Sequence, residues 1–359
     1  MKRIKLAMMG CSHGHARGYY GAFCSHPDFE PVAYSVRPGY EHRVFLEKLP
    51  PEVPRYSDDK QMLDEHPEIE AVVISSENSS HLEQVRLCAE RGIHILSMKV
   101  PSYDMAEYEE IKRLCAENNV VCLVELEFHY TAILRRAKEL VDEGRIGKLL
   151  AFNAYNYSHQ PACWLPWHAI PEESYGKRIP LRPGDDRMRG GGLADHPHVF
   201  DIARYFTDSE YDFVYADVGN RIRKDHPVEE LIHAVGRMKN GVIVSLDPSY
   251  ARTETFMEVI GPGYEIYPKR VEVAFALHGT EGSLLVDVFG PCIHHTGLPA
   301  RKFTTLIATG YGNTCRMDEL AYCIRNHTMP DINLWNHQNT IRAMNAIYES
   351  VETGKPVKL

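Results

Sequence analysis

The sequence predicts an α/β protein of two domains: a doubly wound parallel sheet over residues 1–125, followed by an α+β domain over residues 126–359 with a large open, mostly antiparallel sheet. The first observation is the length, because 359 residues correspond to roughly two domains of about 150 residues each. The second is that short apolar runs alternate with helical segments in the first part, which is typical of parallel strands covered on both faces. The third is that the remainder carries longer runs, which are typical of an open antiparallel sheet.

Each element of the first domain follows from a local pattern. The run over residues 4–9 is apolar and ends at Gly10; it is shorter than the core of a signal peptide, so we interpret it as a buried strand. Gly92 marks the C-terminal end of a helix. The predicted strands are 4–9, 32–36, 71–74, 93–96 and 120–124, and the predicted helices begin near Ala16 and cover 82–91 and 106–118.

The second domain is predicted to combine helices with strands of the open sheet. Its strands include 242–246 and 283–286, and its helices cover 131–143, 316–326 and 339–353, the last of which is able to pack back on the first domain. We expect a ligand cleft at the junction near residue 125. Since an open sheet needs its exposed face covered, we also expect a homodimer or homotetramer built on that face.

Composition and charge argue against several classes of protein. Hydrophobic residues make up 44% and charged residues 25%, as in ordinary globular proteins. The net charge of −9 argues against a nucleic-acid or membrane-surface partner, and no run of about 18 apolar residues predicts a membrane span. The nine cysteines lie singly, without a CxxC pair, which indicates free thiols in the cytoplasm rather than a zinc knuckle or a disulfide framework.

The first turn has part of the composition of a dinucleotide-binding loop. Such a loop needs small residues at its first, third and sixth positions, for a tight turn and close approach to a pyrophosphate. These positions hold Gly10, Ser12 and His15; the first two suit the loop and the third is not small. We expect Gly10, Ser12, His13, Gly14 and His15 to bind the cofactor; the alternative is an ordinary strand–turn–helix connection.

Arg37 follows the second predicted strand, where a carboxylate usually binds the adenosine ribose. An arginine there can accept a 2′-phosphate, with Arg43 nearby, so the cofactor is predicted to be NAD or NADP with a slight preference for NADP. The alternative is a solvated turn residue.

Lys99 lies at the carboxyl end of the predicted parallel sheet, where ligands gather. Its neighbours Met98, Val100 and Pro101 are apolar, and partial burial would make its ammonium a strong local charge or depress its pKa. The alternative is a solvated loop lysine.

The segment from Gly190 to Asp201 carries a further group of candidates. Its three glycines allow the backbone to pass close to a ligand or another chain. We expect Asp195 to cap a helix whose first turn holds His196 and Pro197. The positive helix end favours a neutral His198, which can act as a general base and can interact with Asp201. The alternatives are pure capping for Asp195 and a satisfied core histidine for His198. The apolar stripe of this helix is Val199, Ile202, Ala203 and Phe206.

Two further readings concern histidines and aromatic residues. Asp195, His196 and His198 could hold a metal with ligands such as His13, His15, His129, His159 or His168. Residues so close at a helix start rarely converge on one ion, so we predict no metal. Tyr155, Tyr157, Trp164 and Trp167 could form a platform on which a sugar or aglycone stacks; the alternative is core or interface packing.

These motifs together resemble the glucose–fructose oxidoreductase and inositol dehydrogenase family (Gfo/Idh/MocA), over nearly the whole chain. Ser76–His81 is similar to the family's Thr-Pro-Asn-x-x-His stretch, and Gly92–Lys99 to its segment ending in Glu-Lys-Pro. The order and spacing of the motifs carry the resemblance. Its other parts are 143–148, 190–201, 279–284 and 350–357.

The resemblance implies a Rossmann domain and a nicotinamide-dependent oxidation of a sugar, glycoside or cyclitol hydroxyl, or the reverse reduction. It implies that Lys99 holds the reacting hydroxyl, that His198 takes its proton and that Asp195 orients the base or binds a neighbouring hydroxyl. Ser76, Asn78, His81 and Lys99 are then expected on the cofactor side, and the expected substrate-binding residues are His129, Tyr157, Trp164, Trp167 and His196.

The sequence departs from the family pattern at three places. Lys99 is followed by Val100, with proline one place late; Asp195 lies three residues before His198 instead of four; and the acidic ribose ligand is missing. Either Asp195 or His196 therefore fills the carboxylate's position, or neither does. Two other functions stay open: a redox-neutral epimerisation or elimination with tightly held NAD(H), and a non-catalytic nucleotide-binding protein.

Overall fold

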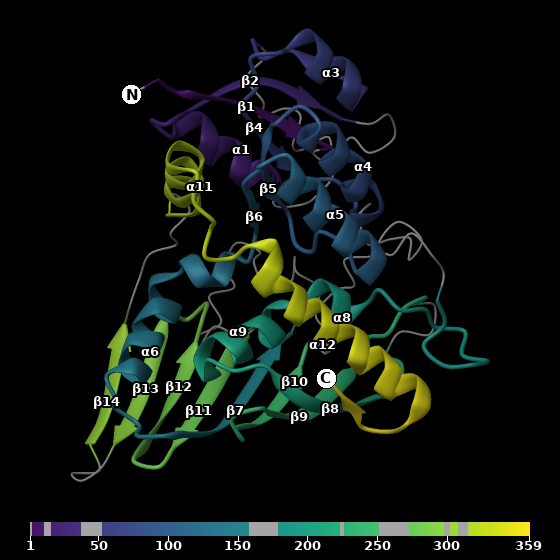
Figure 1. Cartoon of the computed structure of the whole chain (residues 1–359). Helices are drawn as coiled ribbons and strands as arrows, with labels where there is room; N and C mark the ends of the chain where they lie inside the picture. Colours follow the sequence, from purple (N-terminus) through teal and green to yellow (C-terminus); the bar gives the residue numbers. More distant parts are fainter. Residues whose placement is uncertain are drawn as a thin grey trace, which may run out of the picture. The chain divides into compact units, whose positions relative to one another are not determined.

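The computed structural model describes residues 2–10, 16–36, 52–157, 179–222, 226–250, 273–297, 302–307 and 315–359, which form two compact units (Figure 1). Each unit has its own sheet, so the two are described in turn. The first unit comprises Met1–Leu126, Leu165–Lys177 and Gly312–Gln338, and the second comprises Glu127–Trp164, Arg178–Tyr311 and Asn339–Leu359.

The first unit is built on a six-stranded parallel sheet with the order β3-β2-β1-β4-β5-β6. The chain runs outward from β1 to β3 and then returns to β4 on the other side of β1, so the strand order reverses between β1 and β4. In such sheets ligands bind beyond the carboxyl ends of the strands at this reversal. The strands are β1 (Ile4–Met9), β2 (Phe29–Ser35), β3 (Arg55–Tyr56), β4 (Ala71–Ile74), β5 (His94–Ser97) and β6 (Cys122–Val124).

Helices cover both faces of this parallel sheet because its strands are apolar on both sides. On one face, Leu6 and Met8 of β1 pack with Met317 and Leu320 of α11 in a single core cluster. On the other, the Met9 sulfur lies 3.5 Å from the Cys88 thiol of α4. Each such buried side chain contributes about 1.5–3 kcal/mol to folding. The helices are α1 (Ala16–Ser25), α3 (Asp59–Glu65), α4 (Asn78–Ala89), α5 (Met105–Glu117) and α11 (Cys315–Asn326).

The second unit holds a nine-stranded sheet with the order β14-β13-β12-β11-β7-β10-β9-β8-β15, in which β7 and β10 pair in parallel and the other pairs are antiparallel. The α/β class with a parallel sheet followed by a mostly antiparallel one is therefore confirmed. The strands are β7 (Leu149–Asn156), β8 (Tyr211–Val218), β9 (Ile232–Met238), β10 (Ile243–Asp247), β11 (Val273–Gly279), β12 (Gly282–Asp287), β13 (Cys292–Gly297), β14 (Lys302–Ile307) and β15 (Val357–Lys358).

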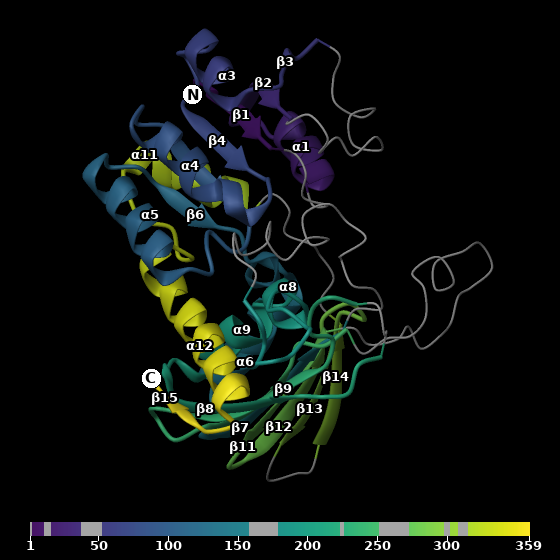
Figure 2. The same ribbon diagram turned by 90° about the vertical axis from the view of Figure 1, so that its right-hand side faces the viewer.

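Helices α6 and α9 pack against one face of this sheet, as Figure 2 shows. Phe206 of α9 lies 5.0 Å from Phe275 of β11 and 6.0 Å from Phe152 of β7, ring centre to ring centre. These three buried rings form the core under the helix. The helical elements of this unit are η1 (Glu127–Tyr130), α6 (Ala132–Asp142), α8 (Gly192–Asp195) and α9 (His198–Thr207), while α12 (Leu334–Thr353) contributes residues to both units.

The predicted start of the helix near Asp195 is wrong. A single helical turn, α8, ends at Asp195, and α9 begins only at His198 with Pro197 at its N-cap position. Pro197 has the φ of −62° that suits a helix start, and no side chain caps α9. Asp195 therefore does not cap α9. The stripe of Val199, Ile202, Ala203 and Phe206 is buried as predicted.

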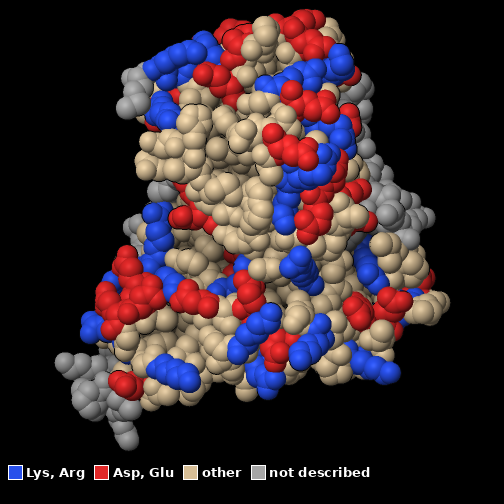
Figure 3. All heavy atoms as spheres, viewed as in Figure 1, with Lys and Arg blue, Asp and Glu red and all other residues tan. Residues whose placement is uncertain are grey.

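The surface of the described residues mixes acidic and basic side chains, as the face in Figure 3 shows. On α4 and α5, for example, Arg86 and Arg113 both pair with Glu110, at 3.2 and 2.7 Å. Among the described helices, we find none that combines the length and the apolar character needed to cross a bilayer.

Candidate active site

Gly10 and Ser76 meet where the strand order of the first unit reverses. Gly10 follows β1 with a φ of +85°, and a Cβ at this position would collide with the Cα and Cβ of Ser76, which follows β4. Only glycine tolerates both the positive φ and this close approach. Gly10 and Ser76 therefore pack directly against each other at the strand-order reversal, where ligands bind in sheets of this kind.

Lys99 follows β5 in a segment whose backbone is held by side chains of α4. The Asn78 amide donates to the Val100 carbonyl at 2.6 Å, and one ring nitrogen of His81 faces the same carbonyl at 3.1 Å. The other ring nitrogen of His81 faces the Ser76 carbonyl at 3.2 Å. Burial lowers the pKa of His81, so the ring is uncharged near neutral pH. Uncharged hydrogen bonds therefore hold the segment that carries Lys99.

Lys99 is 8% exposed, which is unusual for a lysine. It lies at the carboxyl edge of the parallel sheet together with Gly10, Ser76, Asn78 and His81. An ammonium held there supplies a fixed positive charge. These five residues, all predicted from the sequence, are thus brought together in the first unit.

A series of buried, hydrogen-bonded polar side chains, which was not predicted, supports the same edge. The Ser35 hydroxyl at the end of β2 donates to Asp59, the Gln84 amide donates to the other Asp59 oxygen at 2.8 Å, and the Ser76 hydroxyl donates to Gln84. Both oxygens of this carboxylate thus accept bonds from the protein itself. The predicted cofactor residues Ser12, His13, Gly14, His15 and Arg37 lie outside the described residues.

In the second unit, Gly191 and Gly192 approach other backbone of the same unit closely. A Cβ at Gly191 would collide with the Glu229 carbonyl oxygen, and one at Gly192 with that of Pro248. The Glu229 carboxylate accepts the N–H of Gly191 at 3.0 Å and that of Leu193 at 3.2 Å. The single turn α8 is therefore fixed from outside, which a four-residue helix requires.

Asp195 and His196, at the end of α8, face Tyr250. The Tyr250 hydroxyl donates to the Asp195 carboxylate at 3.3 Å, and the His196 Nε2 lies 3.9 Å from the same oxygen. The His196 ring meets the Tyr250 ring edge-on, with centres 5.7 Å apart. Tyr250 was missed from the sequence because nothing in its segment distinguishes it from a core tyrosine.

His198 and Asp201 of α9 both contact the turn η1. The His198 ring packs on Phe128 with centres 4.4 Å apart, and His129 forms a short hydrogen bond with the Asp201 carboxylate. The Thr340 hydroxyl donates to Asp201 at 3.0 Å. The structure thus brings Asp195, His196, His198 and the predicted substrate residue His129 into one region of the second unit.

Tyr157 lies elsewhere. Its hydroxyl donates to Asp247 at 2.9 Å, and its ring stacks on Tyr155 with centres 4.6 Å apart. By the alternation along β7, Tyr155 and Tyr157 occupy the face opposite Phe152, which packs under α9. Trp164 and Trp167 lie outside the described residues.

The geometry of a possible metal site was also considered. Among the described residues, His26, Asp28 and Asp318 of the first unit have ligand atoms within 4.8 Å of one another. Asp28 pairs with Arg325 at 2.7 Å, and this guanidinium lowers the pKa of Asp28. An arginine therefore already supplies positive charge to this cluster.

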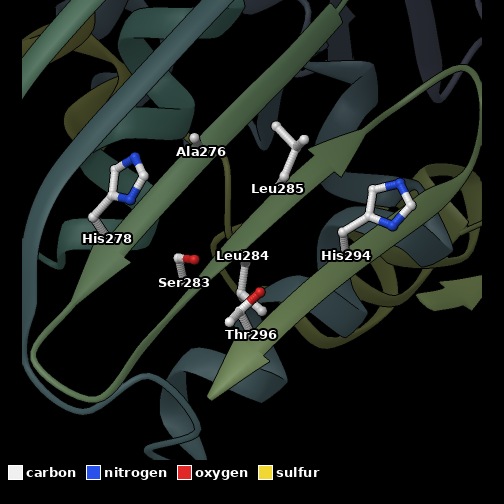
Figure 4. A pocket seen from close by; sticks show the side chains of 7 residues that line it. All are labelled: Ala276, His278, Ser283, Leu284, Leu285, His294 and Thr296. Atoms are coloured by element: carbon white, nitrogen blue, oxygen red, sulfur yellow. The ribbon is translucent and has the colours of Figure 1, made fainter. Parts of the chain in front are cut away.

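The second face of the large sheet carries exposed apolar side chains. Val235, Ile243, Leu285 and Ile307 are 43–73% exposed, and the register places them on the side opposite α9. Figure 4 shows a shallow hollow on β11–β13, to which Leu285 contributes. The other side chains that line it are Ala276, His278, Ser283, Leu284, His294 and Thr296.

The fold and the edge of the parallel sheet define a class of protein, and two family models agree with it. Residues 4–126 match the model described as "Oxidoreductase family, NAD-binding Rossmann fold". The protein is thus an oxidoreductase with an NAD-binding Rossmann domain. Residues 134–285 match the GFO/IDH/MocA C-terminal domain, and the chain belongs to the GFO/IDH/MocA family. The resemblance inferred from the motifs is confirmed.

The names of individual relatives refer to enzymes that act on polyols and sugars. The chain is 26% identical over 267 residues to myo-inositol 2-dehydrogenase of Thermotoga maritima, covering 72% of this chain and 68% of that protein. It is 23% identical to D-xylose 1-dehydrogenase (NADP(+)) 2 of Haloferax volcanii, covering 81% of each. Its fold is similar, with a TM-score of 0.80 and 17% identity, to an Agrobacterium radiobacter oxidoreductase solved with NAD+, L-tartaric acid and magnesium, over 99% of this chain and 98% of that one.

Proposed function

We propose that this protein oxidises a secondary hydroxyl group of a sugar, glycoside or cyclitol with NAD or NADP, or reduces the corresponding carbonyl. The observation that carries the proposal is the buried Lys99 at the carboxyl edge of an NAD-binding Rossmann sheet. The named relatives act on inositol and xylose, which supports a polyhydroxylated substrate.

The residues of the first unit fit a dinucleotide. Gly10, which follows β1, and Ser76, which follows β4, pack together where the strand order reverses, the place at which such sheets bind dinucleotides. A nicotinamide bound at this edge would supply the acceptor for the hydride of the carbinol carbon. Ser76, Asn78 and His81 support the cofactor side of the site, and Ser12, His13, Gly14 and His15 complete the loop.

Three side chains carry out the remaining steps in this proposal. The Lys99 ammonium donates a hydrogen bond to the reacting hydroxyl and favours its alkoxide. His198 takes the hydroxyl proton on a ring nitrogen, and the helix end favours its neutral form beforehand. Asp195 binds a neighbouring hydroxyl or orients the base, with His129 and His196 as further substrate ligands.

The test replaces Lys99 by Met and assays a panel of sugars, glycosides and inositols by the absorbance of the reduced cofactor. Loss of the hydrogen bond and of the positive charge that favour the alkoxide is expected to lower kcat by about 10²–10³-fold while calorimetry shows unchanged cofactor affinity. Lys60→Met, at an exposed position of the first unit, is the control. Turnover retained in Lys99→Met would refute the assignment.

Two measurements separate this function from the other readings. Turnover of a glycoside without net cofactor consumption, together with NAD(H) released at near-stoichiometric yield on acid denaturation, would replace net oxidation by redox-neutral chemistry. Cofactor binding without hydride transfer to any polyol would indicate a non-catalytic protein. Titrating NAD and NADP against wild type and Arg37→Ala tests the preference for NADP, because the variant should lose affinity for NADP alone.

The exposed face of the large sheet is proposed to bind a second copy of the chain, giving a dimer or tetramer. Its row of exposed apolar side chains is costly in water, and self-association covers it. Light scattering of Ile243→Lys against Lys239→Met, a control in the turn before β10, should show dissociation only for the former. A monomeric wild type would contradict the proposal.

We also propose a reducing, cytoplasmic compartment. The described cysteines Cys24, Cys88, Cys115, Cys122, Cys292 and Cys323 are all free thiols. Burial raises the pKa of Cys88, so its thiol stays protonated and inert. Alkylation of the unfolded protein isolated from cells should modify these cysteines fully.

A further inference from the structure

Glu229 is a buried acid in the second unit, and its surroundings differ from those of an ordinary ion pair. Its side chain is 0% exposed. Among the described residues, the groups that bond to its carboxyl oxygens are backbone N–H groups and one hydroxyl, and none is an arginine or a lysine. A carboxyl group so buried needs such donors to ionise at all.

The N–H groups of four successive residues are tied to Glu229. Gly191 and Leu193 donate to its carboxylate at 3.0 and 3.2 Å, and Gly192 donates to its main-chain carbonyl at 3.2 Å. The N–H of Gly190 reaches it through Tyr348, whose oxygen accepts that N–H at 3.1 Å and whose hydroxyl donates to the carboxylate at 2.8 Å. One residue thus holds the whole entry to α8.

The backbone of this entry in turn sets the position of Asp195 and His196. The Asp195 N–H donates to the Gly191 carbonyl at 3.0 Å, and the His196 N–H donates to the Gly192 carbonyl at 3.1 Å. These are the bonds of a single helical turn, which is unstable without outside support. A shift of the Gly191–Gly192 peptide therefore moves the side chains that follow.

We infer that Glu229 is a positioning residue of the active site: its ionised carboxyl group holds the α8 turn in place, and its protonation loosens that turn and misplaces Asp195. The inference rests on the proposed function only in assigning Asp195 to the reaction. The charged form is the tighter anchor, because hydrogen bonds to a charged acceptor are stronger than those to a neutral one.

The pH range of the effect follows from the burial of Glu229. Burial raises its pKa to about 7, while the hydrogen bonds from Tyr348, Gly191 and Leu193 act to lower it. The turn is therefore held more tightly as pH rises through neutrality. Several other ionisable groups surround this site. Arg189 lies over the Tyr348 ring and pairs with Glu352, and Glu230, next in the chain, accepts the Ile222 N–H. The others are Tyr348 itself and, on the turn, Asp195 and His196.

The first test compares Glu229→Gln with wild type by hydrogen exchange of the peptide spanning residues 190–198. We expect faster exchange in this peptide at pH 8. The glutamine amide carries no charge, and its NH2 group would face backbone N–H groups that need an acceptor. This readout needs no substrate, so it stands whether or not the proposed function holds. Glu349→Gln, at an exposed site on α12, is the control and should leave the peptide unchanged. Equal protection in Glu229→Gln and wild type overturns the inference.

The second test uses turnover of whichever polyol is found to react. Misplacing a catalytic group by about 1 Å can cost as much as 10²-fold, so kcat of Glu229→Gln should fall by about 10- to 100-fold with little change in the KM for the cofactor. Tyr348→Phe keeps the shape of the buried side chain and removes one hydrogen bond that lowers the Glu229 pKa. The step that the ionisation of Glu229 produces in the plot of kcat against pH should therefore move to higher pH. A merely structural role would lower the active fraction without moving that step. An unmoved step, or one moved to lower pH, rejects the inference.

Discussion

The two units position their candidate site residues by different physical means. In the first, uncharged groups hold the Lys99 segment: the Asn78 amide and a neutral His81 ring bond to backbone carbonyls. In the second, buried carboxylates hold the site: Glu229 supports the α8 turn and Asp201 bonds to His129. The difference teaches that the pH sensitivity of these anchors lies with Glu229 of the second unit, since burial raises its pKa to about 7.

The pKa values of two glutamates, one in each unit, are shifted in opposite directions. Hydrogen bonding and charge from Arg113 hold the pKa of the half-buried Glu110 down to about 2, whereas burial raises that of Glu229 to about 7. From about pH 2 to 4.5 the unfolded chain binds more protons at Glu110, so this residue makes stability rise with pH. From about pH 4.5 to 7 the folded chain binds more protons at Glu229, so this residue makes stability fall as pH rises.

The largest effect on stability is expected from a substitution that prevents the close contact between Gly191 and the Glu229 backbone in the second unit. Gly191→Ala places a Cβ against the Glu229 carbonyl, which cannot move aside as a flexible side chain could. We expect destabilisation of about 3 kcal/mol, or a fall in Tm of about 6–12 °C by calorimetry. Gly21→Ala in α1 is the control: nothing lies within 4 Å of its Cβ, so the protein should be slightly stabilised. Equal Tm values for the two variants would mean that the contact between Gly191 and the Glu229 carbonyl is looser than the structure shows.

A smaller effect is expected from the uncharged anchor of the first unit. His81→Asn shortens the side chain, so that the backbone carbonyl that accepts the single ring N–H loses this donor, at a cost of about 1–3 kcal/mol in unfolding free energy by urea titration. Because the ring is uncharged, the pH profile of kcat should keep its shape while kcat falls. His327→Asn, an exposed position with φ +52°, should change neither quantity. A pH profile altered by His81→Asn would break the contrast between the units.

The smallest effect is expected at the surface. Glu110→Gln removes pairs with Arg86 and Arg113, so Tm at pH 7 should fall slightly. The difference from wild type should shrink below about pH 4.5 and vanish near pH 2, where wild-type Glu110 becomes protonated. Glu90→Gln, an exposed glutamate at the end of α4, serves as the control. A difference that persists at pH 2 would show that the effect is not electrostatic.

Much of the first unit was accessible from the sequence, because its signals are local. The apolar runs of β1, β4 and β5 and the glycine at position 10 predict the strands, their parallel order and the edge at which Lys99 lies. The start of α4 was placed four residues late, at Leu82 instead of Asn78, because the polar residues of its first turn carry no apolar periodicity. The first turn of α4 nonetheless supplies Asn78 and His81 to the Lys99 segment.

The second unit was less accessible, because its site depends on residues far apart in the chain. Asp195 looks like a helix cap when only its neighbours are considered, yet it ends a separate turn and faces Tyr250. Asp201 bonds to His129 and Thr340, which come from η1 and α12 and are far from it in the sequence. Glu229 was missed because an acid after an apolar residue, at the approach to β9, carries no local signature of burial.

By itself, the sequence determined the fold class, the family, the edge of the parallel sheet and the identity of Lys99 and His198 as candidates, since periodicity, turn residues and motif order act over short distances along the chain. The tertiary structure alone decided which groups hold those candidates: the carbonyls around His81, the backbone behind Gly191 and the buried carboxyl group of Glu229. The physical reason is that a buried polar group must find its partners in space, and the sequence separation of those partners is not constrained.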